Sequence, residues 1–376
     1  MPATLSDQER LDRLRLIRSE NVGPVTFRDL LEQFGSASDA LVALPDLAKR
    51  GGRKQAIKIA SATHAKQEMN DAHKLGAHLL FVGEKSYPPL LSQADPPPPV
   101  IAAIGALHLL ERPSLAIVGS RSASAAGLRM AADLSHDLGE AGYVITSGLA
   151  RGIDAAAHKA TLSTGTAAVV AGGIDIVYPQ ENLSLYEQIK EQGVLVSEMP
   201  PGTRPQGRHF PRRNRIIAGL SRGVIVVEAA LRSGSLITAR FALEQNREVM
   251  VVPGSPLDPR AKGGNRLIKQ GATLVESAED VMQWLEQSPP PLFSEGDEMP
   301  YASPPTPPPE PTKSEREQLL SLLGPTPVEQ DELIRLSGLP TRTVIALLLE
   351  IDLAGRLVRD NGQLVSLLEQ ETEGTD

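Results

Sequence analysis

The chain has 376 residues, no cysteine and a formal net charge of -8. This length is typical of two or three domains, and the lack of cysteine excludes disulfide bonds, thiolate metal sites and a cysteine nucleophile. No apolar run approaches the length of a membrane span, and the first 14 residues contain no apolar signal segment, so we expect a cytoplasmic protein without a membrane partner.

Residues 1–75 predict a small helical domain. Four apolar residues from Phe27 to Phe34 follow the i, i+3, i+4, i+7 spacing of an amphipathic helix, and Gly35 is placed as its C-cap. An earlier helix and a tight turn at residues 21–24 complete a unit that resembles a helix-hairpin-helix or sterile-alpha-motif-like domain. Such hairpins either offer backbone N–H groups to a phosphate or only pack, and both interpretations stay open.

Two less regular segments come next. Six basic residues with no acidic residue among them extend from Lys49 to Lys66. We interpret this run as a solvated helix face and keep auxiliary DNA contact as the alternative. Residues 76–110 contain several prolines, including the run from Pro96 to Pro99, which cannot lie inside a helix, so we expect a connector there.

Residues 111–287 alternate short apolar runs with helical patterns. Seven runs are apolar on both faces, which is typical of strands in a parallel sheet with helices on both sides. We therefore predict an α/β domain with a doubly wound parallel sheet. The runs are LAIVG from Leu115, YVITS from Tyr143, TAAVVA from Thr166, VLVSE from Val194, GVIVVE from Gly223, EVMVVP from Glu248 and ATLVE from Ala272.

The remaining chain predicts a linker and a second small domain. Residues 288–311 are rich in proline and indicate a semi-rigid extended linker. Residues 312–376 predict three helices and a hairpin with an Asp-Asn-Gly turn at residues 360–362, the pattern of a winged helix. Winged helices usually bind duplex DNA, but this tail has six basic and twelve acidic residues, a net of -6. We therefore expect a protein-interaction or dimer-regulating module, flexibly tethered by the linker.

Three loops that follow predicted strands carry small, polar residues. In an open α/β sheet the carboxyl ends of the strands form the edge where ligands bind, and a small-residue turn before a helix suits phosphate. None of the loops matches a dinucleotide fingerprint or a Walker loop. The candidate contact residues are Gly119, Ser120 and Arg121 in the first loop, Ser147, Gly148 and Arg151 in the second, and Ser233, Gly234, Ser235 and Thr238 in the third.

One pair of titratable residues follows the second loop. Asp154 and His158 are one helical turn apart, a spacing that could suggest acid–base chemistry. No nucleophile or third polar partner accompanies them, so we interpret Asp154 as a helix anchor and His158 as structural. The sequence predicts no catalytic residue, no metal and no cofactor.

Residues 204–222, called the arginine segment below, are the most unusual stretch. No acidic residue occurs between Glu198 and Glu228. Arginine rather than lysine throughout favours bidentate phosphate contacts, and a helix running from Pro211 through Ile217 would add the positive end of its dipole. With no carboxylate to pair the arginines, we favour a polyanion site over a solvated turn. The arginines are Arg204, Arg208, Arg212, Arg213, Arg215 and Arg222.

Phe210 lies inside the arginine segment. The chain has only twelve aromatic residues, and proteins that bind single strands combine a basic groove with an aromatic stacking platform. A position in the core is the ordinary alternative for a phenylalanine. Because His209, Pro211 and several arginines flank it, we predict that Phe210 stacks on a base.

Several motifs occur together in order and spacing. They are GSR from Gly119, SGLARGIDAAAH from Ser147, AGGIDIVYP from Ala171, FPRRNRIIAGLS from Phe210, EAALRSGSLITA from Glu228, VPGSP from Val252 and GGNRLIKQGA from Gly263. In these motifs the chain resembles the DNA-processing protein A family, also called DprA or Smf. The resemblance covers the whole α/β domain, and the helical and winged-helix domains match the family's commonest layout.

The resemblance implies an extended Rossmann core and a homodimer. Family members bind and protect single-stranded DNA and help to load RecA recombinase during natural transformation, with no established catalytic activity. Members carry a lysine three places before the phenylalanine, where this chain has Gly207 with Arg208 beside it. Motif by motif, DNA contacts fall on Arg121, on Phe210 with Arg212, Arg213, Asn214 and Arg215, and on Ser233, Ser235 and Thr238.

The alternative is a nucleotide-processing enzyme. Lysine-decarboxylase-like phosphoribohydrolases share a related sheet, but their PGGxGT turn and following glutamate are absent, and the corresponding loop is SGSLIT from Ser233. We favour the non-enzymatic reading, and a search for free base released from nucleoside monophosphates separates the two.

Overall fold

A computed structural model describes residues 5–287, 310–360 and 364–368. The predicted proline-rich linker lies almost entirely outside these ranges. By its internal contacts the chain divides into two units. The sheet unit consists, in its described part, of residues 67–287, and the terminal unit of residues 5–66, 310–360 and 364–368. No helix within the described ranges is both long and apolar enough to cross a membrane.

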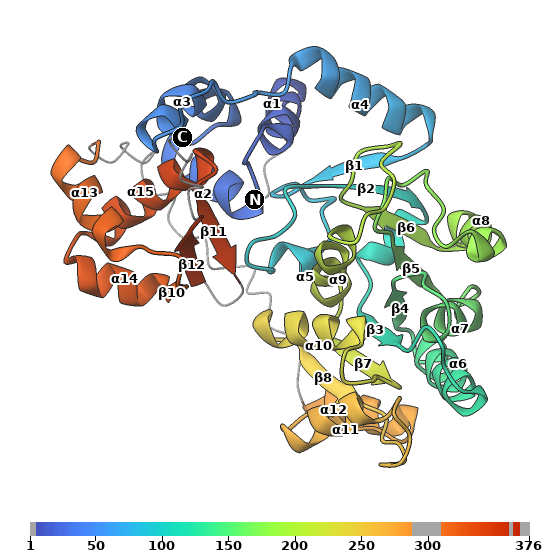
Figure 1. Ribbon diagram of the computed structural model, residues 1–376. Coiled ribbons are helices and arrows are strands. Elements are labelled where there is room, and N and C mark those ends of the chain that lie inside the picture. The colour runs from blue at the N-terminus through green and yellow to red at the C-terminus, as the bar shows by residue number, and fades with distance from the viewer. Residues whose placement is uncertain (1–4, 288–309, 361–363, 369–376) are drawn as a thin grey trace, which may run out of the picture. The chain divides into compact units, whose positions relative to one another are not determined.

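The sheet unit is built on nine strands in the order β1-β2-β6-β5-β4-β3-β7-β8-β9 (Figure 1). The seven predicted strands are present, and they run parallel to one another. Their residues are almost all buried, because helices cover both faces of the sheet. The strands are β3 (Ser114–Gly119), β4 (Val144–Ser147), β5 (Thr166–Val169), β6 (Val194–Ser197), β7 (Gly223–Val227), β8 (Glu248–Val251) and β9 (Thr273–Leu274).

Two strands come from the segment expected to be a connector. β1 (His78–Phe81) and β2 (Val100–Gly105) form an antiparallel pair, and β2 continues antiparallel along β6. The prolines of this segment lie between the two strands, around the short helix α5 (Pro89–Ser92), so they do not interrupt the ladder. The segment therefore extends the sheet at one edge.

Alternate residues of each strand pack into different cores. From β3, Ala116 and Val118 join one apolar cluster with residues of α9 and α10, whereas Leu115 and Ile117 join another with residues of α6 and α7. The covering helices are α6 (Ala125–Glu140), α7 (Ile153–Ala160), α8 (Leu183–Gln192), α9 (His209–Gly219), α10 (Gly234–Glu244), α11 (Lys262–Lys269) and α12 (Ala278–Gln287).

The terminal unit combines both ends of the chain. Its N-terminal part is the predicted helical domain, and α2 ends at Gly35 in the left-handed conformation (φ 78°), as the C-cap prediction required. Its C-terminal part is a winged helix, as predicted from the order of its elements. The helices are α1 (Asp7–Arg18), α2 (Pro24–Phe34), α3 (Ala37–Arg50), α13 (Lys313–Leu322), α14 (Gln330–Ser337) and α15 (Thr341–Leu353), and the strands are β10 (Val328–Glu329), β11 (Leu357–Asp360) and β12 (Leu364–Leu367). Helix α4 (Ala62–Lys74) leads into the sheet unit.

Candidate nucleic-acid interface

The sheet has a topological switch point at β3. The chain continues from β3 to β4 on one side and later adds β7 on the other side. Loops that leave the carboxyl ends of these strands diverge, and ligands of open α/β sheets bind in the crevice between them. A cavity of about 580 Å³ occupies this position in the sheet unit. Its walls come from the loops after β3, β4 and β7 and from α9.

The loop after β3 approaches β7 closely and brings Arg121 to the cavity. A Cβ atom on Gly119 would lie 1.9 Å from the carbonyl oxygen of Val227, so only glycine fits there. Ser120 and Arg121 follow along the cavity wall, and the Arg121 side chain is exposed. Ser124 then caps α6 by accepting a hydrogen bond from Gly127 N–H at 3.0 Å.

Glu228 connects the loops after β3 and β7. Its carboxylate accepts hydrogen bonds from the backbone N–H of Ser124, at 2.9 Å, and from the Ser124 hydroxyl. Glu228 itself has a φ of 52°, and Leu149 at the end of β4 has a φ of 53°. Each such conformation costs about 1 kcal/mol or more in a residue with a side chain. Strained backbone therefore occurs at two of the three strand ends that surround the cavity.

The arginine segment begins beyond β6 and runs into α9. The helix starts at His209, so Pro211 lies in its first turn, as predicted. Arg204, Arg208 and Arg212 are exposed, whereas Arg213 is buried at 6% exposure. Because neighbouring residues on a helix point in different directions, Arg212 faces solvent while Arg213 faces the sheet.

The expectation that no carboxylate pairs with these arginines is wrong for two of them. Glu198, at the end of β6, is buried and forms ion pairs with Arg215 and, at 3.6 Å, with Arg212. Arg215 is largely covered by this contact, while Arg212 keeps 49% of its side chain exposed. The pairing therefore removes Arg215 from the exposed basic surface more than it removes Arg212.

Arg213 lines the cavity and connects the ends of β4 and β5. Its Nη1 atom donates to the carbonyl oxygens of Gly148 and, at 2.6 Å, Val169, and its Nε atom donates to the Asn214 side chain at 3.1 Å. Burial lowers the pKa of Arg213 to about 10, with the Asp154 carboxylate acting against that shift, so the guanidinium stays charged at neutral pH. A Cβ on Gly148 would collide with this guanidinium, 2.3 Å from Nη1.

The loop after β4 is held by buried polar groups. Asp154 accepts hydrogen bonds from the N–H groups of Gly148 at 3.1 Å and Ala150 at 3.3 Å, which supports its interpretation as an anchor. The His158 ring contacts Leu149 N–H and, at 2.7 Å, the Thr166 hydroxyl, and burial lowers its pKa to about 3. This imidazole is therefore neutral and enclosed, as a structural histidine should be.

The predicted contact residues of the second loop differ in exposure. Ser147 is fully buried and donates to Ile117 O at 2.6 Å, so its hydroxyl points into the sheet. Arg151 is exposed, with Glu181 at 3.6 Å on the surface. Such an exposed ion pair contributes little to stability and leaves the arginine accessible to a ligand.

The loop after β7 completes the cavity at the start of α10. Ser233 caps this helix by accepting from Ser235 N–H at 3.3 Å, and Gly234 leaves open space where a side chain would stand. Ser235 and Thr238 are largely buried but line the cavity, and Asn214 donates to Gly234 O at 3.3 Å. The positive end of the helix dipole at this start suits an anion.

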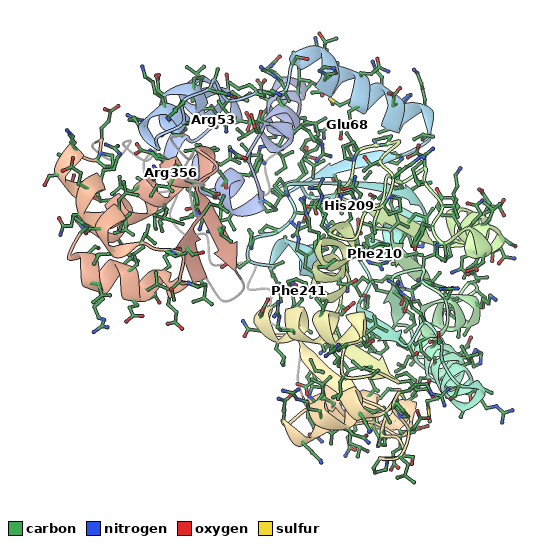
Figure 2. All side chains as sticks on the ribbon, viewed as in Figure 1. Arg53, Glu68, His209, Phe210, Phe241 and Arg356 are labelled. Carbon is green, nitrogen blue, oxygen red and sulfur yellow. The ribbon has the colours of Figure 1, made fainter. Side chains whose placement is uncertain are left out.

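An aromatic and cationic stack stands beside the cavity. The Arg121 guanidinium carbon lies 5.3 Å from the centre of the Phe210 ring, and the ring of Tyr178 lies 5.5 Å from it at an angle of 57°. Figure 2 labels Phe210 and His209 at the start of α9. Phe210 is only partly buried, and Tyr178 is 49% exposed. Both rings therefore keep part of their surface open to solvent.

Sequence reasoning missed two residues of this site. Tyr178 belongs to the AGGIDIVYP motif, whose single exposed aromatic ring was not considered as a platform. Arg232 precedes Ser233 and is an exposed residue of the cavity wall. Within the described residues, neither Arg232 nor Arg208 has an ion-pair partner. The signal available in the sequence was that each of these two arginines lies between a predicted strand and the helix that follows it.

Three family profiles match the chain. DNA recombination-mediator protein A matches residues 78–286, a DprA-like N-terminal HHH domain matches residues 7–71, and a DprA winged helix domain matches residues 303–363. These matches cover the sheet unit and both parts of the terminal unit.

Named relatives agree with these profiles. Protein Smf of Escherichia coli is 41% identical over 300 residues, 77% of each chain, and DNA processing protein DprA of Bacillus subtilis is 46% identical over 56% of this chain and 72% of its own. The X-ray structure of DprA from Streptococcus pneumoniae superposes with a TM-score of 0.62 at 37% identity, covering 74% of this chain and 98% of that one. A Helicobacter pylori structure, described as giving insights into the single-stranded DNA binding mode of DNA processing protein A, has a TM-score of 0.52 at 27% identity and covers 56% of this chain and 96% of that one.

Proposed function

Because the chain belongs to the DNA recombination-mediator protein A family, also called DprA or Smf, we propose that it binds single-stranded DNA at the cavity beside β3 and β7. The observation that carries this proposal is the stack of Arg121 on Phe210 at the rim of a cavity with exposed arginines. A basic groove beside an aromatic platform is the arrangement that holds single strands without reading their sequence.

Phosphate groups would be held by exposed cations and by the start of α10. Arg121, Arg208 and Arg212 are exposed, and Arg232 lines the same cavity. Arginine contacts phosphate in bidentate fashion, and the positive end of the α10 dipole at Gly234 adds an attraction that needs no side chain. Gly119, Ser120, Ser233, Ser235 and Thr238 would line this phosphate path, with Arg151 at its far end.

Bases would stack on Phe210 and Tyr178. A base has an apolar face and little charge, so it gains from contact with an exposed ring. Arg121 contributes both to the ring stack and to a neighbouring phosphate. This double role predicts that its removal costs more than the loss of one charge.

Buried residues of the segment would position the site. We assign Arg213, Asn214 and Arg215 to this role, together with Ser147 and Gly148, because their polar atoms are engaged inside the sheet unit. We assign Arg208 to the contact that the family's lysine makes. Gly207 has open space around it, so a lysine could be accommodated there as well.

Affinity measured across a salt series tests the proposal. Fluorescence anisotropy with a labelled oligonucleotide should give tighter binding to the single strand than to the matched duplex, with little sequence preference. Affinity should fall as salt rises, because bound phosphates release counterions. Equal affinity for the duplex would rule out the stacking arrangement.

The cellular role that follows is protection of incoming DNA and loading of RecA recombinase in natural transformation. We propose a cytoplasmic homodimer for this role. Three experiments test protection, RecA loading and dimerisation separately. They are nuclease protection of a bound single strand, RecA filament assembly with and without the protein, and sedimentation at several concentrations.

We propose no catalytic step. The two acid–base candidates, Asp154 and His158, are buried and engaged with the backbone or with Thr166. Incubation with nucleoside monophosphates should release no free base. Release of base that is lost in an Asp154→Asn variant would instead favour a phosphoribohydrolase.

A further inference from the structure

Helix α15, the third helix of the winged helix, is buried on two sides. One stripe, Val344, Leu347, Leu348 and Ile351, belongs to the apolar core of the winged helix. A second stripe, Ala346, Leu349, Glu350 and Leu353, has the same i, i+3, i+4, i+7 spacing, and each of its residues is at most 6% exposed. The second stripe does not belong to that core. A helix with two such stripes lies between two layers.

The second layer is the N-terminal helical domain. Helix α15 packs against α2 and α3 within the terminal unit. The backbones meet closely, because a Cβ on Gly51, just after α3, would lie 1.9 Å from the carbonyl oxygen of Glu350. Glycine is therefore required at the end of α3 for the two domains to approach.

Polar contacts across this interface are specific. Glu350 is buried between two arginines, Arg50 of α3 at 3.0 Å and Arg316 of α13 at 2.7 Å. Thr26 of α2 donates to the Asp352 carboxylate at 2.8 Å. Three carbonyl and carboxylate contacts extend the interface: Asn21 Nδ2 to Leu353 O at 3.1 Å, Arg356 Nη1 to Gly51 O at 3.1 Å, and Arg359 to Asp29 at 3.8 Å. Figure 2 labels Arg356 and Arg53, which belong to the two parts of the terminal unit that meet here.

We propose that α15 is a protein-docking helix whose partner is the N-terminal helical domain of the same chain. In winged helices that bind duplex DNA, this helix enters the major groove. Here the helix instead directs two carboxylates to the N-terminal domain: Glu350 of the second stripe pairs with the Arg50 guanidinium, and Asp352 accepts from the Thr26 hydroxyl. Carboxylates at these positions repel phosphate. The two ends of the chain thereby form one module, and the winged helix is docked on the N-terminal helical domain rather than moving freely on the linker.

Disulfide trapping tests the docked arrangement, since the chain contains no cysteine. The variant Thr26→Cys with Asp352→Cys should form an intramolecular disulfide on mild oxidation, detected by gel mobility without reductant and by peptide mass. A control pair, Thr26→Cys with Leu336→Cys, uses an exposed residue of α14 and should stay reduced. Persistent free thiols in the first pair, or a disulfide that joins two chains, would overturn the proposal.

Removal of Arg50 tests the charge selection. Arg50→Ala should lower the rate of trapping several-fold, whereas the matched control Arg335→Ala, which breaks only the exposed pair with Glu332, should leave it unchanged. An unchanged rate in Arg50→Ala would count against a role for the buried pair.

Arg50→Glu separates a docking helix from a masked DNA-reading helix. The variant places a carboxylate against Glu350 and should open the interface, with an unchanged helical circular dichroism signal as the check on folding. Duplex affinity at physiological salt should stay as weak as in the parent chain. A gain of duplex binding on opening would mean that α15 reads DNA when released, and the proposal would be wrong.

Discussion

Two segments of this chain are rich in basic residues, but they differ in whether carboxylates pair with those residues. In the run from Lys49 to Lys66, Arg50 pairs with the buried Glu350 and with Glu310, and Arg53 pairs with Glu20 at 2.8 Å. In and around the arginine segment, Arg121 and Arg232 line a cavity and Arg208 is exposed next to the cavity residue Gly207, and no ion pair is formed by these three arginines in the described structure. A basic run in a sequence therefore does not by itself indicate a polyanion site, because the fold decides how far carboxylates cover its charges.

Arg213→Ala should produce the largest effect, and on stability rather than on binding. The change leaves the carbonyl oxygens of Gly148 and Val169 buried without their donor, at about 1–3 kcal/mol each. Thermal denaturation should show a clearly lower melting temperature. Arg212→Ala, one residue away and half exposed, is the matched control and should change stability by no more than about 0.5 kcal/mol. Equal melting temperatures for the two variants would contradict the buried role.

Phe210→Ala should weaken single-strand binding by about 1–3 kcal/mol without changing its salt dependence. The ring carries no charge, so no phosphate contact is lost with it. Tyr178→Ala should have a smaller effect of the same kind. If Phe210→Ala lowered the melting temperature sharply but bound normally per folded molecule, Phe210 would be a core residue.

Single arginine removals should each cost about one phosphate contact. Arg121→Ala and Arg208→Ala should each reduce the slope of log affinity against log salt by about 0.7, the value for one single-strand phosphate. Arg121→Ala should lose additional affinity at high salt because its stack on Phe210 is also lost. A Gly207→Lys variant, in contrast, should steepen the slope by a similar amount. Unchanged slopes in all three would place the phosphate path elsewhere.

Changes in the first basic run should have the smallest effect on DNA. Arg50→Ala and Arg53→Ala remove residues that are engaged by carboxylates of the terminal unit, so single-strand affinity should stay within about twofold and the salt slope should not change. A shallower slope in either variant would restore the auxiliary DNA contact as an explanation of this run.

Much of the sheet was predictable, because each parallel strand is a short run that is apolar on both faces. Strands β1 and β2 were not predicted, since the prolines between them indicated a connector, although β2 is a buried apolar run like the parallel strands. The loops at the strand ends were found from their small residues. The exposure of Arg212 and the burial of Arg213 were not predictable, because they depend on the rotation of α9 about its axis. The pairing with Glu198 was not predictable either, because this residue comes from the end of β6, outside the arginine segment.

The position of β2 in the sheet has a consequence for how the chain folds. β2 pairs with β1 immediately before it, but its other neighbour is β6, with Ala102 opposite Ser197. During synthesis, residues 100–105 emerge long before residues 194–197. One edge of β2 therefore has no partner strand until β6 has been made. Such long-range pairing slows folding and exposes an edge to other chains in the interval. The segment before β3 is therefore made first but can join the parallel strands only after β6 has been made.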